Sequence, residues 1–259
     1  MCTLVALHRC TAGVPLWVAA NRDEYLDRPA EGPALRAGPR GPIVAPLDRQ
    51  AGGTWWGINP QGVFAAVTNR PARRLDTTRR SRGRLVVDLL AAPSARHAAE
   101  HARSLGAGLY NPCNLFVADA DAAFAVVYEE APRLLPLAPG VHVIGNADPD
   151  ARAVAKIRRT MERAERIAAE PEAAIRDGLA RLCRTHGDDP DPRGDPCVHL
   201  GGYGTRSSTL LRLGSNEDLL EHAEGPPCTS SYGDFTPLLT ELERTAAAGT
   251  GELATRKAS

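Results

Sequence analysis

The feature that most constrains the fold is a series of short apolar segments separated by turn residues. Four of them occur in the first 70 residues: TLVAL (3–7), LWVAA (16–20), TWWGI (54–58) and VFAAVT (63–68). Their close spacing, with Asn-Pro-Gln-Gly at 59–62 between the last two, predicts hairpins and therefore an antiparallel sheet. Because the segments are apolar at successive positions rather than at alternate ones, we expect both faces of the sheet to be covered.

Helical and strand-like segments alternate in blocks along the rest of the chain. Helices are predicted at 83–92, 94–105 with Ser94 as N-cap, 150–170 and 172–185, and further strands at 114–118, 122–128, 141–146 and 208–213. No repeat or linker divides the chain. We therefore expect a single domain over residues 1–243, with two stacked sheets and helices outside them, and a disordered polar tail over 244–259.

Charge and hydropathy exclude several classes of protein. Lys plus Arg and Asp plus Glu number 31 each, so no overall field favours nucleic acid or an anionic membrane. The arginines of 70–84 could face an acidic ligand, but the pattern favours a solvated loop. No apolar run is long enough to span a membrane, and the first residues lack the pattern of a signal peptide, so we expect a cytoplasmic protein.

The six cysteines are expected to be reduced thiols, as is usual for a cytoplasmic protein. Cys197-Val-His199 brings a cysteine and a histidine close together, but no further ligand follows at the spacing of a zinc site. We therefore predict neither a metal nor a cofactor.

Cys2 is the first residue whose position suggests chemistry. Removal of Met1 would leave Cys2 with both a thiol and a free α-amine. Such an amine has an ordinary pKa of about 8, so it can act as a base at neutral pH without a histidine. Alternatively, Cys2 is simply a small apolar residue at the start of a strand.

Polar residues follow several of the apolar strands directly. Asn-Arg-Asp-Glu (21–24) follows LWVAA, Asn69 follows VFAAVT, and Asn146 follows a strand that ends in Gly145. Arg206 directly precedes the last predicted strand. A thiol that attacks an amide needs an acid to hold the amine, amide donors for the oxyanion and a nearby cation, and these residues are of the required types. Turn formation and helix capping would explain each of them separately.

Several motifs in order resemble the NRDE family, also called the transport and Golgi organisation protein 2 family, over roughly residues 1–214. They include MCTLVAL, AANRDEYLDRP, GGTWWGIN, GVFAAVTNRP, YNPCNLFVAD and GYGTRSSTLL. This family is in turn similar to the N-terminal-nucleophile hydrolases. The resemblance implies an α+β fold, a four-layer α-β-β-α sandwich of two antiparallel sheets.

The resemblance also implies roles for particular residues. In the penicillin V acylases and bile salt hydrolases the nucleophile is a cysteine exposed by processing, which Cys2 matches. Asp23 matches the acid that orients the amine, Asn69 and Asn146 match the oxyanion and substrate-positioning residues, and Arg206 matches a late arginine. Those enzymes carry Arg-x-x-Asp, whereas here Arg and Asp are adjacent, so the role of Arg22 stays open.

Two functions are compatible with these residues. The first is a cysteine N-terminal-nucleophile amidohydrolase or acyltransferase that acts on a small linear amide or acyl substrate, with Arg22, Trp55 and Tyr203 as candidates to bind it. Packing alone would also explain the two aromatic residues. The second is a carrier or trafficking factor for haem or lipid with the same fold, because members of the family are associated with such ligands.

Overall fold

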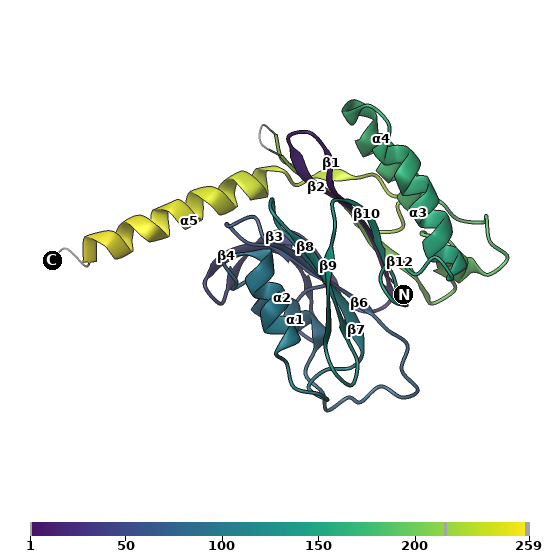
Figure 1. Ribbon diagram of the computed structural model, residues 1–259, viewed down its shortest axis with the longest axis horizontal. Coiled ribbons are helices and arrows are strands. Elements are labelled where there is room, and N and C mark those ends of the chain that lie inside the picture. The colour runs from purple at the N-terminus through teal and green to yellow at the C-terminus, as the bar shows by residue number, and fades with distance from the viewer. Residues whose placement is uncertain (1, 215–216, 257–259) are drawn as a thin grey trace.

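Two seven-stranded antiparallel sheets form the centre of the molecule in this computed structural model, over the described residues 2–214 and 217–256 (Figure 1). The first sheet has the order β10 (Gly140–Ile144), β1 (Thr3–Thr11), β2 (Val14–Tyr25), β12 (Tyr203–Leu213), β13 (Leu219–Ala223) and β14 (Gly233–Asp234), and β11 (His199–Leu200) also pairs with β12. The second sheet has the order β3 (Ala30–Gly38), β4 (Gly41–Asp48), β5 (Trp56–Ile58), β6 (Phe64–Asn69), β7 (Cys113–Ala118), β8 (Ala123–Tyr128) and β9 (Arg133–Leu137).

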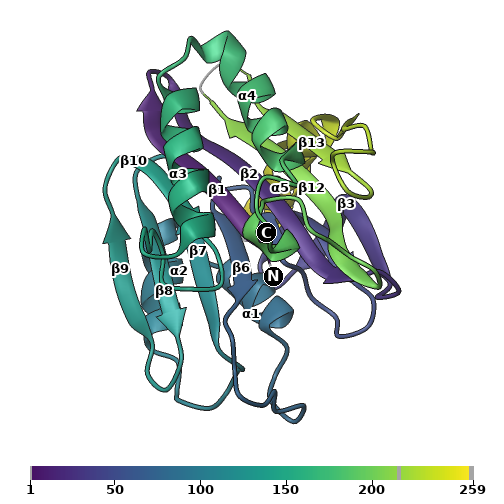
Figure 2. The ribbon, with the colours of Figure 1, turned by 90° about the vertical axis from the view of Figure 1, so that its right-hand side faces the viewer.

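Helices cover the outer face of each sheet. α1 (Arg82–Leu89) and α2 (Ala95–Arg103) pack on the second sheet, and α3 (Ala155–Ala168) and α4 (Glu172–Arg184) pack on the first, as Figure 2 shows for the latter pair. The layers therefore follow the order α-β-β-α, and the predicted four-layer sandwich is confirmed. Ser94 caps α2, as predicted, by accepting a hydrogen bond from the His97 amide.

Alternate residues of the central strands serve different layers of the core. Leu4 and Ala6 of β1 pack between the two sheets, whereas Val5 and Leu7 of the same strand pack under α3 and α4. Successive side chains of a strand point to opposite faces, and both faces of β1 are buried here. This burial explains why the strand is apolar at every position.

A close approach between two glycines shapes one end of the second sheet. Gly53 has φ +87°, and a Cβ atom there would lie 2.3 Å from the carbonyl carbon of Gly83. The amide of Thr54 donates to the Gly83 carbonyl at 3.0 Å. This contact holds the loop before β5 against the start of α1, which brings Trp55 and the arginine-rich segment to the same edge of the sheet.

The sequence did not predict six of the strands. β3 and β4 contain glycine and proline, which argue against a strand, but β3 lies at a sheet edge where such residues are tolerated. β9, at the other edge, carries a proline as well, and β11, β13 and β14 are short.

The C-terminal region also differs from the expectation. α5 (Pro237–Arg256) is a helix that includes most of the tail expected to be disordered. It leads away from the sheets (Figure 1). Its sequence is rich in Leu, Ala, Glu and Arg, which favour helices, and Leu239 and Leu242 anchor its beginning in the core between the sheets. Residues 257–259 lie outside the described residues, and the single-domain boundary at 243 stays a prediction. Among the described helices, none combines the length and apolar character needed to traverse a lipid bilayer.

Candidate active site

A cavity of about 620 Å³ opens where the start of β1 and the end of β2 face the second sheet. Cys2, Arg22 and Asp23 line it from the first sheet, and Trp55 and Asn69 line it from the second. The remaining wall comes from the loop after β4 and from the arginine-rich segment that leads into α1. Five residues singled out in the sequence therefore meet in one cavity.

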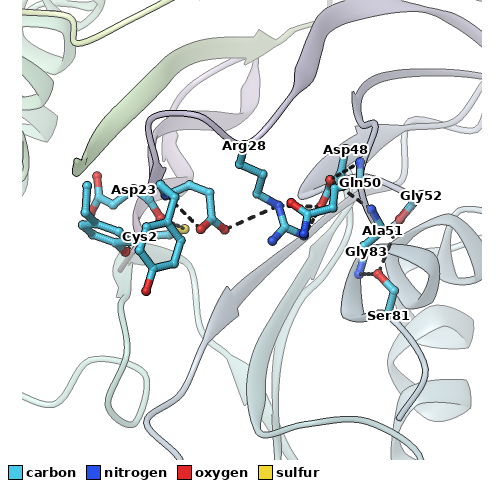
Figure 3. Close-up of polar contacts among 12 residues, drawn as sticks. Cys2, Asp23, Arg28, Asp48, Gln50, Ala51, Gly52, Ser81 and Gly83 are labelled. Carbon is cyan, nitrogen blue, oxygen red and sulfur yellow. Dashed lines mark hydrogen bonds and ion pairs between the residues drawn. The ribbon is translucent and has the colours of Figure 1, made fainter. Parts of the chain in front are cut away.

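The pairing of β1 with β2 places Cys2 beside Asp23. Thr3 pairs with Asn21, so the residue before Thr3 lies level with the two residues after Asn21. The Cys2 thiol points to the Asp23 carbonyl oxygen, with an Sγ–O distance of 3.9 Å (Figure 3). Antiparallel pairing thus explains how a residue at the end of β2 reaches the start of the chain.

The Asp23 carboxylate is buried, with 1% of the residue exposed. Thr205 Oγ1 donates a hydrogen bond to Asp23 Oδ1 at 2.6 Å, and Lys156 Nζ lies 3.9 Å from Oδ2. Burial raises the pKa of Asp23 to about 6, while the Lys156 ammonium acts in the opposite direction. At neutral pH the carboxylate is therefore mostly ionised and can hold an ammonium group.

The sequence argument missed Thr205 and Lys156. Thr205 pairs with Asp23 across β12 and β2, directly before the bulge at Arg206. Lys156 lies in the first turn of α3, and its amino group is buried. Lys156 is one of only two lysines in a chain whose other basic residues are arginines, which is the one sequence signal that could have drawn attention to it.

The Cys2 thiol is half-buried, and burial raises its pKa above the ordinary value. The Asp23 carboxylate adds to this rise, whereas the Arg22 guanidinium opposes it. The thiol is therefore protonated at neutral pH and needs a base before it can attack. Among the described residues that line the cavity there is no histidine to serve as that base.

Two arginines give the cavity a positive wall. The Arg22 guanidinium lies over the Trp55 ring, 4.2 Å from its centroid, and Arg82 donates to the Pro112 carbonyl. Within the described part of the chain, neither arginine has a carboxylate at ion-pair distance. Burial lowers the pKa of both guanidinium groups, because removing a charge from water favours its neutral form.

Glu24, the remaining charged residue of the Asn-Arg-Asp-Glu stretch, has a local partner. Glu24 Oε2 lies 3.9 Å from Arg28 Nε. Arg28 makes a closer ion pair with Asp48 at 2.7 Å, and Figure 3 shows it between the Cys2 end of the cavity and Asp48. These contacts tie the end of β2 to the end of β4.

Asn21 has a structural contact rather than a place in the cavity. Its side chain is buried, and Nδ2 donates to the carbonyl oxygens of Cys183 and Pro196, both at 2.9 Å. It thereby joins β2 to the end of α4 and to the segment before β11. Its sequence neighbours Arg22, Asp23 and Glu24 line the cavity instead.

Asn69 and Asn146 meet, but they are not equivalent. Asn69 ends β6 and lines the cavity, whereas Asn146 follows β10, and its Nδ2 donates to the Asn69 carbonyl. Asn146 is not among the described residues that line the cavity.

Arg206 and Tyr203 belong to β12, next to the end of β2, and they lie outside the cavity wall. Arg206 is the extra residue of the bulge in β12, and its guanidinium donates to the Leu26 carbonyl. Tyr203 donates its hydroxyl hydrogen to the Asp23 carbonyl at 3.0 Å. Both residues contact the segment that carries Asp23, and neither is among the described lining residues.

Solved structures with this fold include two amidohydrolases. An N-acylethanolamine-hydrolyzing acid amidase ortholog from Caenorhabditis elegans matches with a TM-score of 0.57 and 11% identity, over 81% of this chain and 92% of that one. A variant of the conjugated bile acid hydrolase from Clostridium perfringens matches with a TM-score of 0.55 and 8% identity, over 90% and 96%. At such low identity these likenesses establish the N-terminal-nucleophile hydrolase fold alone.

Sequence relatives carry the family assignment. Transport and Golgi organization protein 2 homologs from Bos taurus and Homo sapiens are each 31% identical, over 76% of this chain and 81% of theirs. The family model described as Transport and Golgi organisation 2 matches residues 1–223. This chain therefore belongs to the Transport and Golgi organisation 2 family.

Proposed function

We propose that the protein is a cytoplasmic cysteine N-terminal-nucleophile enzyme that acts on a linear, non-peptide amide or acyl substrate. Either water or a second acceptor takes the acyl group from Cys2. The observation that carries the proposal is the Cys2 thiol beside the buried Asp23, in a cavity whose described lining holds no histidine. Without a histidine, the α-amine that the nucleophile itself carries is the base whose ordinary pKa of about 8 best suits neutral pH.

Removal of Met1 supplies that base as the α-amine of Cys2. The amine takes the thiol proton, and the thiolate attacks the carbonyl carbon of the substrate. When the tetrahedral intermediate collapses, the ammonium returns the proton to the leaving group, and an acyl-Cys2 thioester remains. Water or an acceptor then attacks the thioester, and the thiol regains its proton. Asp23 holds the ammonium in place, because its carboxylate is mostly ionised at neutral pH.

Asn69 is the proposed oxyanion donor. It lines the same cavity as Cys2 from the second sheet, and a side-chain amide is a donor of the type that stabilises an oxyanion. Asn146 is proposed to act through Asn69, since its side chain already donates to the Asn69 carbonyl. Arg206 and Tyr203 are proposed to position the Asp23 segment rather than to touch substrate.

The walls of the cavity favour a substrate with an anionic end. Arg22 and Arg82 face the cavity, and within the described part of the chain neither has a carboxylate partner. A carboxylate or a similar group on the substrate would bind there with charge-assisted hydrogen bonds. Trp55, which stacks on Arg22, offers apolar surface for the rest of the molecule.

The same observations support a second candidate, a non-catalytic carrier of haem or lipid. A cavity of about 620 Å³ with a cationic wall can hold an amphipathic anion without any reaction. Burial that raises the pKa of Cys2 also favours an unreactive thiol. The two candidates differ in whether Cys2 becomes acylated.

A substrate panel of N-acyl amino acids and acyl amides separates them. Intact-mass measurement should find an acyl group on Cys2 of the wild type, and free product should accumulate. Cys2→Ala should abolish both, while still permitting Met1 removal because alanine is also small. Cys10→Ala is the matched control, since Cys10 is a part-buried thiol at the far end of β1 and should leave turnover unchanged. If wild type and Cys2→Ala behave alike and both bind haem or a lipid tightly, the carrier replaces the enzyme.

A further inference from the structure

Four metal-ligating side chains from three separate segments meet outside the active-site cavity. Cys197 and His199 stand on the segment that enters β11, His186 follows the end of α4, and Cys228 lies in the turn after β13. The first and last of them, His186 and Cys228, are 42 residues apart along the chain, so no local sequence motif brings the four together.

The distances among these ligand atoms match the edges of a tetrahedral zinc site. Cys197 Sγ lies 3.7 Å from Cys228 Sγ, and His199 Nε2 lies 3.5 Å from Cys197 Sγ and 3.2 Å from Cys228 Sγ. Zinc bonds of about 2.3 Å to sulfur and about 2.0 Å to nitrogen imply tetrahedron edges of about 3.8 Å between two sulfurs and about 3.5 Å between sulfur and nitrogen. One ligand atom from each of His186, His199 and Cys228 lies within 4.8 Å of the other two, so His186 approaches the site from the side of His199 and Cys228 and is the candidate fourth ligand.

We propose that Cys197, His199, Cys228 and His186 bind one Zn²⁺ in a structural site. Two thiolates and two imidazoles are a ligand set that zinc accepts in tetrahedral geometry, and the two thiol protons leave to solvent when the ion binds. Two thiolates also balance the charge of the ion. The sequence alone predicted no metal, because only Cys197 and His199 are close together in the chain. The proposal differs because the fold adds two distant residues, His186 and Cys228.

Hydrogen bonds already hold the backbone of this site in position. The Cys197 amide donates to the Thr185 carbonyl at 2.9 Å, next to His186. Arg184 Nε donates to the Pro227 carbonyl at 3.0 Å, next to Cys228. The site therefore links three segments whose backbones are fixed to one another without the ion, as a preformed metal site requires.

The site also lies behind Asp23. The Val198 amide donates to Thr205 Oγ1, and the same hydroxyl donates to the Asp23 carboxylate. Asn21 holds the Pro196 carbonyl just before Cys197. The ion would thus stabilise the frame that carries Asp23, and it would take no part in the reaction.

Zinc content and coordination of the whole protein test the proposal. The protein should be produced without a histidine tag in zinc-supplemented medium and dialysed before elemental analysis. We expect one zinc per chain, and an X-ray absorption shell of two sulfurs at about 2.3 Å and two nitrogens at about 2.0 Å. This measurement on the wild type does not depend on any variant.

Variants then identify the ligands. Cys228→Ser and His186→Ala should each weaken zinc binding by roughly 100-fold or more, measured by competition with a chromophoric chelator. Loss of a residue that only hydrogen-bonds to a zinc ligand can already cost up to about 100-fold, and loss of a ligand should cost at least as much. His186 is exposed, so its replacement leaves the core intact. Cys10→Ser and His101→Ala are matched controls outside the cluster and should bind zinc as the wild type does.

Four results would overturn the proposal. They are a wild type that loses all zinc on dialysis, a coordination shell without sulfur, unchanged affinity in Cys228→Ser, and a Cys197–Cys228 disulfide in protein purified under argon.

Discussion

Replacing Lys156 by methionine should raise the pKa of Asp23. Lys156→Met removes the one cation at ion-pair distance from this carboxylate within the described residues, and it keeps a side chain of similar length. Burial already raises the Asp23 pKa to about 6, and the Lys156 charge is the largest effect that lowers it. Without that charge, the pKa should rise further. Thr205 would keep its hydrogen bond to Oδ1.

The separation of the two charges sets the size of the effect. At 3.9 Å, Coulomb's law gives about 4 kcal/mol at an effective dielectric constant of about 20, and about 1 kcal/mol in bulk water. One pKa unit corresponds to about 1.4 kcal/mol, so the shift lies between about one and three units. Because the Asp23 side chain is fully buried and that of Lys156 is 12% exposed, we expect a value near two to three units, which places the pKa at about 8–9.

This shift should appear both in Asp23 itself and in turnover. At pH 7 the ionised fraction of Asp23 would fall from about nine-tenths to between about one-tenth and one-hundredth, so kcat/KM should fall roughly 10- to 100-fold. The acid limb of the pH profile should move upward by the same number of units. Carbon-13 NMR of the aspartate carboxyl groups reads the pKa directly and needs no substrate.

Two variants control for other effects of the substitution. Lys156→Arg keeps a positive charge and should restore most of the wild-type profile. Arg158→Met removes an exposed cation from the same helix, where it pairs with Glu162, and should change nothing. An Asp23 pKa that stays at about 6 in a folded Lys156→Met protein would refute the electrostatic argument.

Three further outcomes follow from neighbouring contacts. Asn21→Ala should lower the free energy of unfolding by about 2–3 kcal/mol in urea denaturation, because two buried carbonyls lose their donor; a change below about 0.5 kcal/mol would contradict this. Since folding raises the Asp23 pKa from 3.8 to about 6, the folded state binds more protons between these values, and stability falls as pH rises through them. The stability of the wild type relative to Asp23→Asn should therefore decrease by about 2 kcal/mol from pH 4 to pH 7 in thermal or urea unfolding, and a flat difference would argue against a buried carboxyl. Arg22→Gln should raise KM at least about 10-fold for a substrate with a carboxylate and much less for the matching amide; equal effects on both would exclude Arg22 as the anion-binding group.

The core strands and the outer helices were predictable because burial on both faces leaves a direct signal. The first five positions of VFAAVT are apolar, and every residue from Val63 to Thr68 is buried. The edge strands leave no such signal: β3 and β9 are half-exposed and contain proline, so their pairing depends on neighbours that no local pattern reveals.

The candidate site could be predicted only as far as strand ends could be recognised. Cys2, Asp23 and Asn69 flank or end apolar runs. Antiparallel pairing of β1 with β2 brings Cys2 to Asp23, and the stacking of the two sheets brings Asn69 to the same cavity. Arg206 was placed with them on the same grounds, but a bulge turns its side chain toward the Leu26 carbonyl. Lys156 and the four proposed zinc ligands come from elements whose relative placement is set by tertiary packing, which a sequence pattern does not specify.

The strand order also has a consequence for the timing of synthesis. β2 pairs with β12, and the Asp23 and Thr205 side chains that meet there are 182 residues apart in the chain. At about 5–20 residues per second, a ribosome needs roughly 10–40 s to make the intervening segment. During that interval the end of β2 lacks its β12 neighbour, so an aminopeptidase can meet Met1 before the sheet around Asp23 is complete. Trimming of the nascent chain can therefore be complete before β12 arrives to close the sheet around Asp23.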